Sequence, residues 1–273
     1  MMGDQGLDPC SYAGLEVLEG LVRTVAHREI MPRFGAGGSR LKEDGSLVTA
    51  ADTAVQAWLT EELRIRWPNF GMVGEEMSEA EQYAALQSPH GVWCLDPLDG
   101  TTNFVNGLPF FAVSLALLQK GEPVLGLIYD PVRAECFKAL RGQGAWLNAQ
   151  RLPEPGRPPA LRRCLAFVDF KRLKPRLAGR LGVDPPYGSQ RNCGSCALDW
   201  CWLAAGRVHL YLHGGQKLWD YAAGSLILRE VGGIATTLEG HRLSYGELKP
   251  ASAVAARSAD LYEAWRAWIS HNA

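Results

Sequence analysis

The chain has 273 residues, a formal net charge of −1 and 47% hydrophobic residues. This length can bury a large core, as one domain or two sub-domains, and the balanced charge excludes a general attraction to nucleic acid or to membranes. The N-terminus lacks the basic-then-apolar pattern of a signal peptide, and the longest apolar stretch, 110–118, is too short to span a bilayer. Seven scattered cysteines in a chain of this size indicate a reducing, cytoplasmic location.

Two helices are expected before the first strands. Residues 11–31 carry Leu15, Leu18 and Val22 at helical spacing. A second helix is expected within 46–67, and Pro68 closes it. Tight turns and apolar runs then predict short strands at 70–76, 92–95, 122–131, 134–140 and 145–148.

The second half of the chain alternates between strands and helices. A proline-rich stretch, 153–160, is the candidate boundary, and 161–190 has no clear periodicity. Beyond it we expect a helix at 195–207 with Ser195 near its N-cap, a strand at 208–213, and helices at 220–233 and 260–269. The whole pattern predicts an α/β (α+β) protein of stacked layers in two unequal sub-domains.

Acidic residues stand at the ends of several of these elements: Asp52, Glu75, Glu76, Asp96, Asp99 and Asp220. Asp52 could cap the helix that it begins, and Asp220 could cap a helix beginning at 221, because aspartate is a favoured N-cap residue. Glu75 and Glu76 could form a solvated turn. Taken singly, none of these four acids requires a functional explanation.

The stretch "WCLDPLDGTTNF" (93–104) is harder to explain by capping alone. Pro97 disfavours helix at Asp96, Gly100 permits a close turn, and Thr101 can begin a helix whose free N–H groups attract an anion. Two carboxylates beside an anion site repel both each other and the anion unless a divalent cation lies between them. Mg²⁺ is typically held by carboxylates together with substrate phosphate. The stretch therefore predicts a metal and phosphate corner.

Other chemistries fail on spacing. An aspartyl-phosphate phosphatase of the haloacid-dehalogenase kind needs Asp-x-Asp, whereas this chain has Asp-x-x-Asp. The Ca²⁺ loop of an EF-hand, the Walker lysine loop, the dinucleotide-binding glycine pattern and paired zinc ligands are absent from the sequence.

Two motifs, "DPLDGTTNF" (96–104) and "WDYAAG" (219–224), resemble those of the inositol monophosphatase family, which belongs to the Mg²⁺-dependent, lithium-sensitive phosphatases. Supporting motifs occur in the same order along the chain: "KEDGSLVTAAD" (42–52), "VGEE" (73–76), "GLPFFAVSLAL" (107–117), "GLIYDPVRAECFKALRGQGAWLN" (126–148) and "GSCALDWCWLAAGRV" (194–208). The resemblance implies a layered α-β-α-β-α sandwich of the sugar-phosphatase type. In it, 1–150 would form an N-terminal α+β sub-domain carrying most metal ligands, and 151–273 a C-terminal α/β sub-domain completing the site.

The resemblance also implies a set of metal ligands. Family members bind two or three Mg²⁺ ions and hydrolyse phosphomonoesters by attack of an activated water. Carried over by motif, Glu75, Asp96 and the Leu98 carbonyl would hold one ion. Asp96, Asp99 and Asp220 would hold a second, and Glu75 would hold a third through waters.

Further residues would act on water and substrate. The resemblance implies that Asp52, Glu75 and Thr101 are catalytic, with Asp52 and Thr101 orienting the nucleophilic water. The N–H groups of Gly100 and Thr101 would bind the phosphate. The substrate would also be contacted by Asp99, Gly194, Ser195, Cys196, His213 and Asp220.

His213 departs from the family pattern, in which many members carry a glutamate seven residues before the motif aspartate. Because that position usually contacts a polyol, the histidine bears on substrate choice. An unperturbed histidine has a pKa near 6.5, so we expect that its charge could change in the working pH range if it faces the site. Alternatively, it packs against its own strand.

These features predict a Mg²⁺-dependent phosphomonoesterase of the inositol-1-monophosphatase type. The alternatives are phosphatases for fructose 1,6-bisphosphate, histidinol phosphate or 3'-phosphoadenosine 5'-phosphate, and a regulatory partner of the transcription machinery. Basic residues at 162–163 and 171–180 could serve such a partner, although a solvated face explains these charges better. We expect a cytoplasmic homodimer that acts on a small phosphorylated substrate and binds neither membrane nor nucleic acid.

Overall fold

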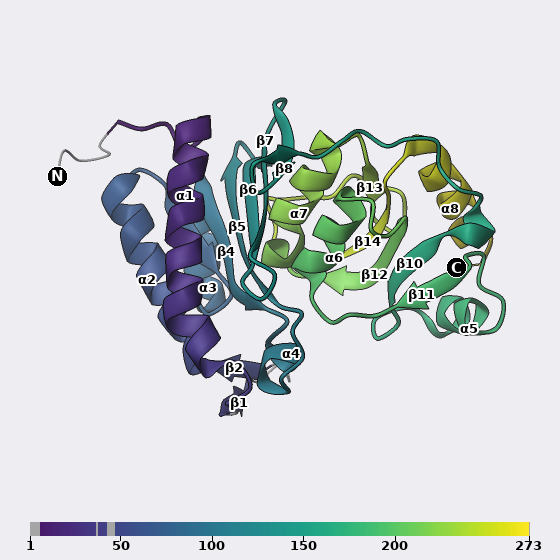
Figure 1. Cartoon of the computed structure of the whole chain (residues 1–273), viewed down its shortest axis with the longest axis horizontal. Coiled ribbons are helices and arrows are strands. Elements are labelled where there is room, and N and C mark those ends of the chain that lie inside the picture. The colour runs from purple at the N-terminus through teal and green to yellow at the C-terminus, as the bar shows by residue number, and fades with distance from the viewer. Residues whose placement is uncertain (1–5, 37, 43–46, 273) are drawn as a thin grey trace.

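Two β-sheets and three groups of helices alternate in the computed structural model, which describes residues 6–36, 38–42 and 47–272. The order of the layers is helix, sheet, helix, sheet, helix (Figure 1). The predicted layered α/β sandwich is therefore confirmed. A separate two-stranded ribbon, β1 (Ser39–Leu41) and β2 (Leu47–Thr49), lies at the end of the molecule next to α4 (Thr101–Val105).

The larger sheet has seven strands in the order β3-β4-β5-β6-β7-β8-β9. β3 and β4 are parallel, and every later neighbour is antiparallel. The strands are β3 (Gly71–Gly74), β4 (Val92–Asp99), β5 (Ala112–Gln119), β6 (Glu122–Asp130), β7 (Glu135–Leu140), β8 (Gly144–Leu147) and β9 (Gln150–Arg151). Every residue of β4 is buried, which fits a strand covered on both faces.

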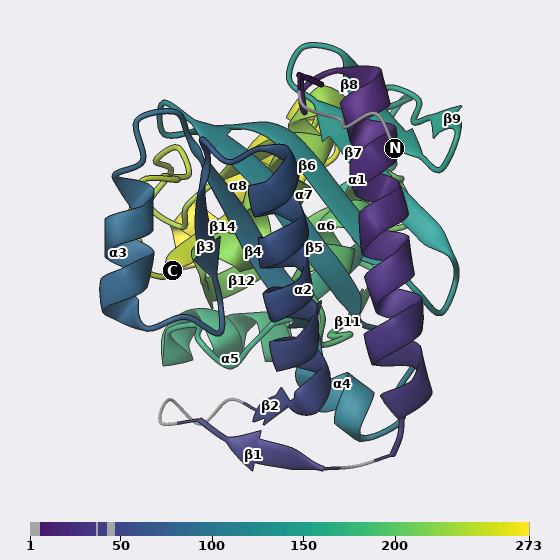
Figure 2. The ribbon, with the colours of Figure 1, turned by 90° about the vertical axis from the view of Figure 1, so that its left-hand side faces the viewer.

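Helices α1 (Tyr12–Val25) and α2 (Ala50–Arg66) cover one face of this sheet (Figure 2). Their apolar faces share a core with side chains of the sheet. α1 continues through a π-helical turn, Ala26–Ile30, and a 3₁₀ turn, Met31–Arg33, so the helix predicted at 11–31 is confirmed. A short helix that the sequence pattern did not predict, α3 (Glu79–Leu86), joins β3 to β4.

The second sheet has five strands in the order β11-β10-β12-β14-β13. They are β10 (Leu165–Asp169), β11 (Ser189–Arg191), β12 (Leu210–Gln216), β13 (Ile234–Thr236) and β14 (Ala251–Ala256). Helices α6 (Cys196–Ala204) and α7 (Leu218–Glu230) fill the space between the two sheets, where the largest core cluster lies. Helices α5 (Pro175–Val183) and α8 (Ala259–Asn272) cover the outer face of the second sheet.

The start of α7 corrects one expectation. The helix begins at Leu218, so Asp220 is its third residue and not the cap of a helix beginning at 221. The N-cap is Lys217, whose backbone N–H donates to Oδ2 of Asp220 at 2.8 Å. Ser195 is the N-cap of α6, as predicted.

The connection between β9 and β10 carries the chain from one sheet to the other. The division into sub-domains 1–150 and 151–273 stays a prediction. All seven cysteines are free thiols. None of the helices within the described ranges combines the length and the apolar character that a membrane crossing needs.

Candidate metal and phosphate site

Three aspartates from two elements meet between the sheets. Asp96 and Asp99 lie at the end of β4, and Asp220 lies in the first turn of α7. Each offers a carboxylate oxygen, and these oxygens all lie within 4.8 Å of one another. The pairing of β4 with β5 shifts between Asp96 and Asp99, which allows both acids of the Asp-x-x-Asp motif to reach one point.

The turn after β4 depends on Gly100. Its φ is +88°, a left-handed conformation that side chains disfavour. A Cβ at this position would lie 3.0 Å from the carbonyl oxygen of Phe110. A glycine therefore allows β4 to turn directly into α4, with Thr101 as the first helical residue.

Asp99 connects the first sheet to α6. Its Oδ2 accepts hydrogen bonds from the hydroxyl of Ser195 and from the backbone N–H of Ala197, the latter at 2.8 Å. Burial raises the pKa of Asp99 to about 6, although these hydrogen bonds oppose the shift. The carboxyl is thus firmly positioned but poorly solvated.

Burial and mutual repulsion also affect the other two acids. Burial is the main cause that raises the pKa values of Asp96 and Asp220 well above their usual range, and the neighbouring carboxylates raise them further. A cluster of largely buried, hard oxygen donors that repel one another fits a divalent cation such as Mg²⁺. The three aspartates therefore form an acidic cluster suited to a metal ion.

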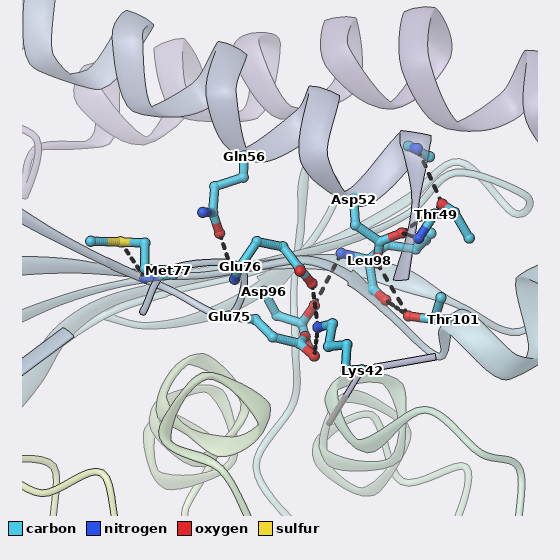
Figure 3. A network of polar contacts seen from close by, with 12 residues as sticks. Lys42, Thr49, Asp52, Gln56, Glu75, Glu76, Met77, Asp96, Leu98 and Thr101 are labelled. Atoms are coloured by element: carbon cyan, nitrogen blue, oxygen red, sulfur yellow. Dashed lines mark hydrogen bonds and ion pairs between the residues drawn. The ribbon is translucent and has the colours of Figure 1, made fainter. Parts of the chain in front are cut away.

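Asp52 and Thr101 lie near Asp96 (Figure 3). Asp52 is the third residue of α2, and its Oδ2 accepts hydrogen bonds from the backbone N–H and the hydroxyl of Thr49, so it does take part in capping that helix. Its other oxygen, Oδ1, lies 3.3 Å from Oγ1 of Thr101, which in turn lies 2.9 Å from the carbonyl oxygen of Leu98. Burial raises the pKa of Asp52. Asp52 can thus both take part in capping α2 and act beside the predicted metal and phosphate corner.

Glu75 and Glu76 do not form a solvated turn. Nζ of Lys42 lies 2.8 Å from Oε1 of Glu75 and 2.5 Å from Oε1 of Glu76 (Figure 3). The side chains of the two glutamates are only 20% and 13% exposed. Burial alone would lower the pKa of Lys42, but the two carboxylates outweigh it and raise that pKa.

A cavity of about 620 Å³ holds most of the residues that the sequence singled out. It is lined by Glu75, Asp96, Leu98, Asp99, Gly100, Thr101, Gly194, Ser195, Cys196, His213 and Asp220. Asp52 is linked to the cavity through Thr101. The structure thus brings the expected site residues together, while the roles implied for them stay predictions.

His213 lines the cavity although only 3% of its surface is exposed. Nδ1 accepts a hydrogen bond from the backbone N–H of Gly215 at 3.1 Å, and Nε2 lies 3.6 Å from Oδ2 of Asp169. Burial lowers the pKa of His213 to about 4, helped by Arg172 and Lys171 and opposed by Asp169. The expectation that its charge changes in the working pH range is therefore wrong, because a desolvated imidazole stays neutral there.

The sequence interpretation placed none of the following residues of the cavity in the site: Lys42, Asp169, Lys171, Arg172, Asp199 and Lys217. Oδ1 of Asp199 is buried without a hydrogen-bond partner in the described part of the chain, and burial raises its pKa well above the usual range. Only one of these residues had a usable signal: Asp169 ends the short apolar run 165–168, as Asp96 ends its own.

Comparisons with known proteins agree with this geometry. The model of the inositol monophosphatase family matches residues 14–269. A relative from Pasteurella multocida, named Nus factor SuhB, is 41% identical over 205 residues, covering 73% of this chain and 75% of the relative. An inositol-1-monophosphatase from Mesorhizobium japonicum is 37% identical over 211 residues, covering 73% and 75%. The crystal structure of the extragenic suppressor protein suhB from Bartonella henselae, 29% identical, superimposes with a TM-score of 0.83 over 96% of this chain and 100% of that one.

Proposed function

The chain belongs to the inositol monophosphatase family, and we propose that it is a Mg²⁺-dependent phosphomonoesterase. The single observation that carries this proposal is the cluster of Asp96, Asp99 and Asp220 at the turn into α4. Asp96 and Asp99 are buried and Asp220 is partly buried. Three mutually repelling carboxylates in such a place destabilise a protein without a cation, so their presence favours a working metal centre over a structural role.

The proposed ligands are Glu75, Asp96, the Leu98 carbonyl, Asp99 and Asp220, shared among two or three ions. Mg²⁺ bound there would neutralise charge on the phosphoryl oxygens and lower the pKa of an attacking water. The N–H groups of Gly100 and Thr101 would bind the phosphate at the glycine turn.

Asp52 and Thr101 would orient the attacking water and accept its proton. Oγ1 of Thr101 can accept a hydrogen bond from that water and donate its own hydrogen to Oδ1 of Asp52, 3.3 Å away. The backbone and hydroxyl of Thr49 hold the Asp52 carboxylate in place. Because burial raises the pKa of Asp52, this carboxylate has an increased affinity for the proton that the water releases.

The family suggests myo-inositol 1-phosphate as a test substrate and inhibition by Li⁺ at the metal site. We also propose a cytoplasmic homodimer, following the family. Phosphate release should be measured across sugar, polyol, nucleotide and amino-alcohol phosphates, with Mg²⁺ and with chelator. Release that requires Mg²⁺ and falls with added Li⁺ supports the proposal, and no release from any substrate contradicts it.

A second candidate function is a regulatory role in transcription. It is favoured by the name Nus factor, carried by the Pasteurella multocida relative. Exposed basic side chains on and near α5, including Arg162 and Arg180, offer a surface for such a contact. The test is retention of transcription complexes on the immobilised protein at low and moderate salt, because a contact based on charge should weaken with salt. Retention by an inactive Asp220→Asn variant would separate this role from phosphatase activity.

A further inference from the structure

Three of the residues that line the cavity carry positive charges. Lys171 and Arg172 follow β10, and Lys217 precedes α7; all three line the cavity. In the described part of the chain, none of the three forms an ion pair with a carboxylate, in contrast to Lys42. We name Lys171, Arg172, Lys217 and His213 the outer subsite.

Arg172 is held at this place by the backbone. Its Nη1 donates a hydrogen bond to the carbonyl oxygen of Gly215 at 2.5 Å. A Cβ on Gly214 would lie 2.2 Å from the carbonyl oxygen of Arg172, so only glycine lets the two segments approach this closely. The pairing of β12 with β14 shifts between His213 and Gln216, which bends β12 at the same point. The guanidinium is therefore positioned by the fold rather than free at the surface.

The carboxylate of Asp169, which also lines the cavity, is already engaged. Asp169 lies opposite His213 in the parallel pairing of β10 and β12. Its Oδ1 accepts a hydrogen bond from the backbone N–H of Lys171 at 2.7 Å, and its Oδ2 faces Nε2 of His213. Asp169 thus shapes the loop, and its side chain forms no ion pair with Lys171 or Arg172.

His213 contributes no negative charge. Many family members carry a glutamate here, which would oppose the neighbouring cations. Nδ1 of the buried imidazole instead accepts a hydrogen bond and therefore carries no hydrogen. The only N–H of the ring is then on Nε2, and the imidazole is neutral. Asp199, another carboxyl that lines the cavity, is 5% exposed, and its raised pKa favours the uncharged form. The outer subsite is therefore positive overall.

We propose that the outer subsite binds a second anionic group of the substrate, so that the enzyme prefers a phosphomonoester that carries another phosphate over the same molecule without it. This inference rests on the proposed phosphatase function. The carboxylates of the three-aspartate cluster would bind the scissile phosphate through the metal. Arg172 and the two lysines would bind the second phosphate by charge-assisted hydrogen bonds.

Two matched pairs of substrates test this preference, because each pair differs by one phosphate. The first is fructose 1,6-bisphosphate with fructose 1-phosphate. The second is 3'-phosphoadenosine 5'-phosphate with adenosine 3'-phosphate. In at least one pair we expect a kcat/KM for the doubly phosphorylated substrate that is higher by about tenfold or more. The pair that shows the difference identifies a sugar or a nucleotide skeleton.

Arg172→Gln and Lys217→Gln should each lower this ratio by about tenfold, mainly through KM. Arg172 also interacts electrostatically with Asp220, so Arg172→Gln can reduce the hydrolysis rate of every substrate. Comparing the ratio of the two kcat/KM values removes this shared effect. Arg176→Gln is the control: it removes the same charge from an exposed position on α5 that does not line the cavity, and should leave the ratio unchanged. His213→Glu should lower the ratio as well, because it adds a negative charge.

The outcomes separate this inference from its premise. If the wild-type protein with Mg²⁺ releases phosphate from no substrate of the wider panel, the phosphatase proposal fails and the subsite fails with it. If it releases phosphate from other phosphomonoesters but from none of these four, the subsite alone is wrong. If both monophosphates are hydrolysed as efficiently as their doubly phosphorylated partners, the subsite alone is wrong. A ratio that stays within twofold in both Arg172→Gln and Lys217→Gln also overturns the subsite alone.

Discussion

The ammonium nitrogen of Lys42 lies 2.8 Å from Oε1 of Glu75, so a positive charge of the chain itself neutralises a carboxylate that we expect to hold Mg²⁺. Glu76 shares the same ammonium. Lys42 thus stabilises Glu75 and Glu76 and would compete with a metal ion for them.

Lys42→Gln should lower the stability of the metal-free protein by about 1–2 kcal/mol, because two mostly buried carboxylates lose their partner. The rise in Tm on adding Mg²⁺ should be larger than in the wild type, since the cation would fill the same role. Thermal melts with chelator and with Mg²⁺ measure both effects. The control is Arg64→Gln, which breaks an exposed pair with Glu61 and should change neither Tm. An equal Mg²⁺-induced rise in Lys42→Gln and wild type would show that Lys42 does not compete with the metal.

Ser195→Ala should weaken the metal site more than its role as an N-cap explains. The hydroxyl of Ser195 donates to Asp99 and also caps α6. Its loss removes a hydrogen bond that favours the ionised carboxylate, so the pKa of Asp99 should rise and more Mg²⁺ should be needed for half-maximal activity. Ser78→Ala is the matched control, because Ser78 is the N-cap of α3, outside the cavity. Equal Mg²⁺ requirements in the two variants would disprove the special role of Ser195.

The stability of the metal-free protein should rise as the pH falls from 8 toward 5. The folded pKa values of Asp96, Asp99 and Asp220 are raised, that of Asp99 to about 6. The folded state therefore binds protons more tightly than the unfolded state, and stability increases as the pH falls through the folded pKa values. Saturating Mg²⁺ should reduce or reverse this slope, because the ion requires ionised ligands. Melting temperatures at a series of pH values, with chelator and with Mg²⁺, test the sign; a chelated protein that loses stability over this range would contradict it.

The metal and phosphate corner around Asp96 and Asp99 could be predicted from the sequence because the features that indicate it are neighbours in the chain. An apolar run, a proline, a glycine and two acids lie within a few residues, and together they fix a strand end and a turn. Asp220 joins them only through tertiary packing of α7, so its place in the site came from the family resemblance and not from spacing. The early helices were predictable because their apolar residues repeat over several turns.

The outer subsite could not be predicted, because its parts are short and distant in the chain. β10 and β11 have five and three residues, and the turn-rich stretch around them shows no periodicity. The contact between Asp169 and His213 depends on the parallel register of β10 and β12, which sequence patterns do not report. The pairing of Lys42 with two glutamates likewise arises from the fold. α3, by contrast, had a visible signal in Ser78 and Glu81, the two residues of its capping box.

The central claim is that a metal held by the three aspartates hydrolyses phosphomonoesters. The most direct measurement is Mg²⁺-dependent phosphate release by wild type, Asp220→Asn and Asp184→Asn, on every substrate that the wild type accepts. Asp184 is half exposed and lies outside the cavity, so Asp184→Asn controls for the loss of one carboxylate. We predict that Asp220→Asn keeps its fold and, with chelator, melts at no lower temperature than the wild type. It should lose at least about a hundredfold in kcat and not be rescued by saturating Mg²⁺, whereas Asp184→Asn matches the wild type. Turnover by a folded Asp220→Asn within a few-fold of wild type would contradict the account.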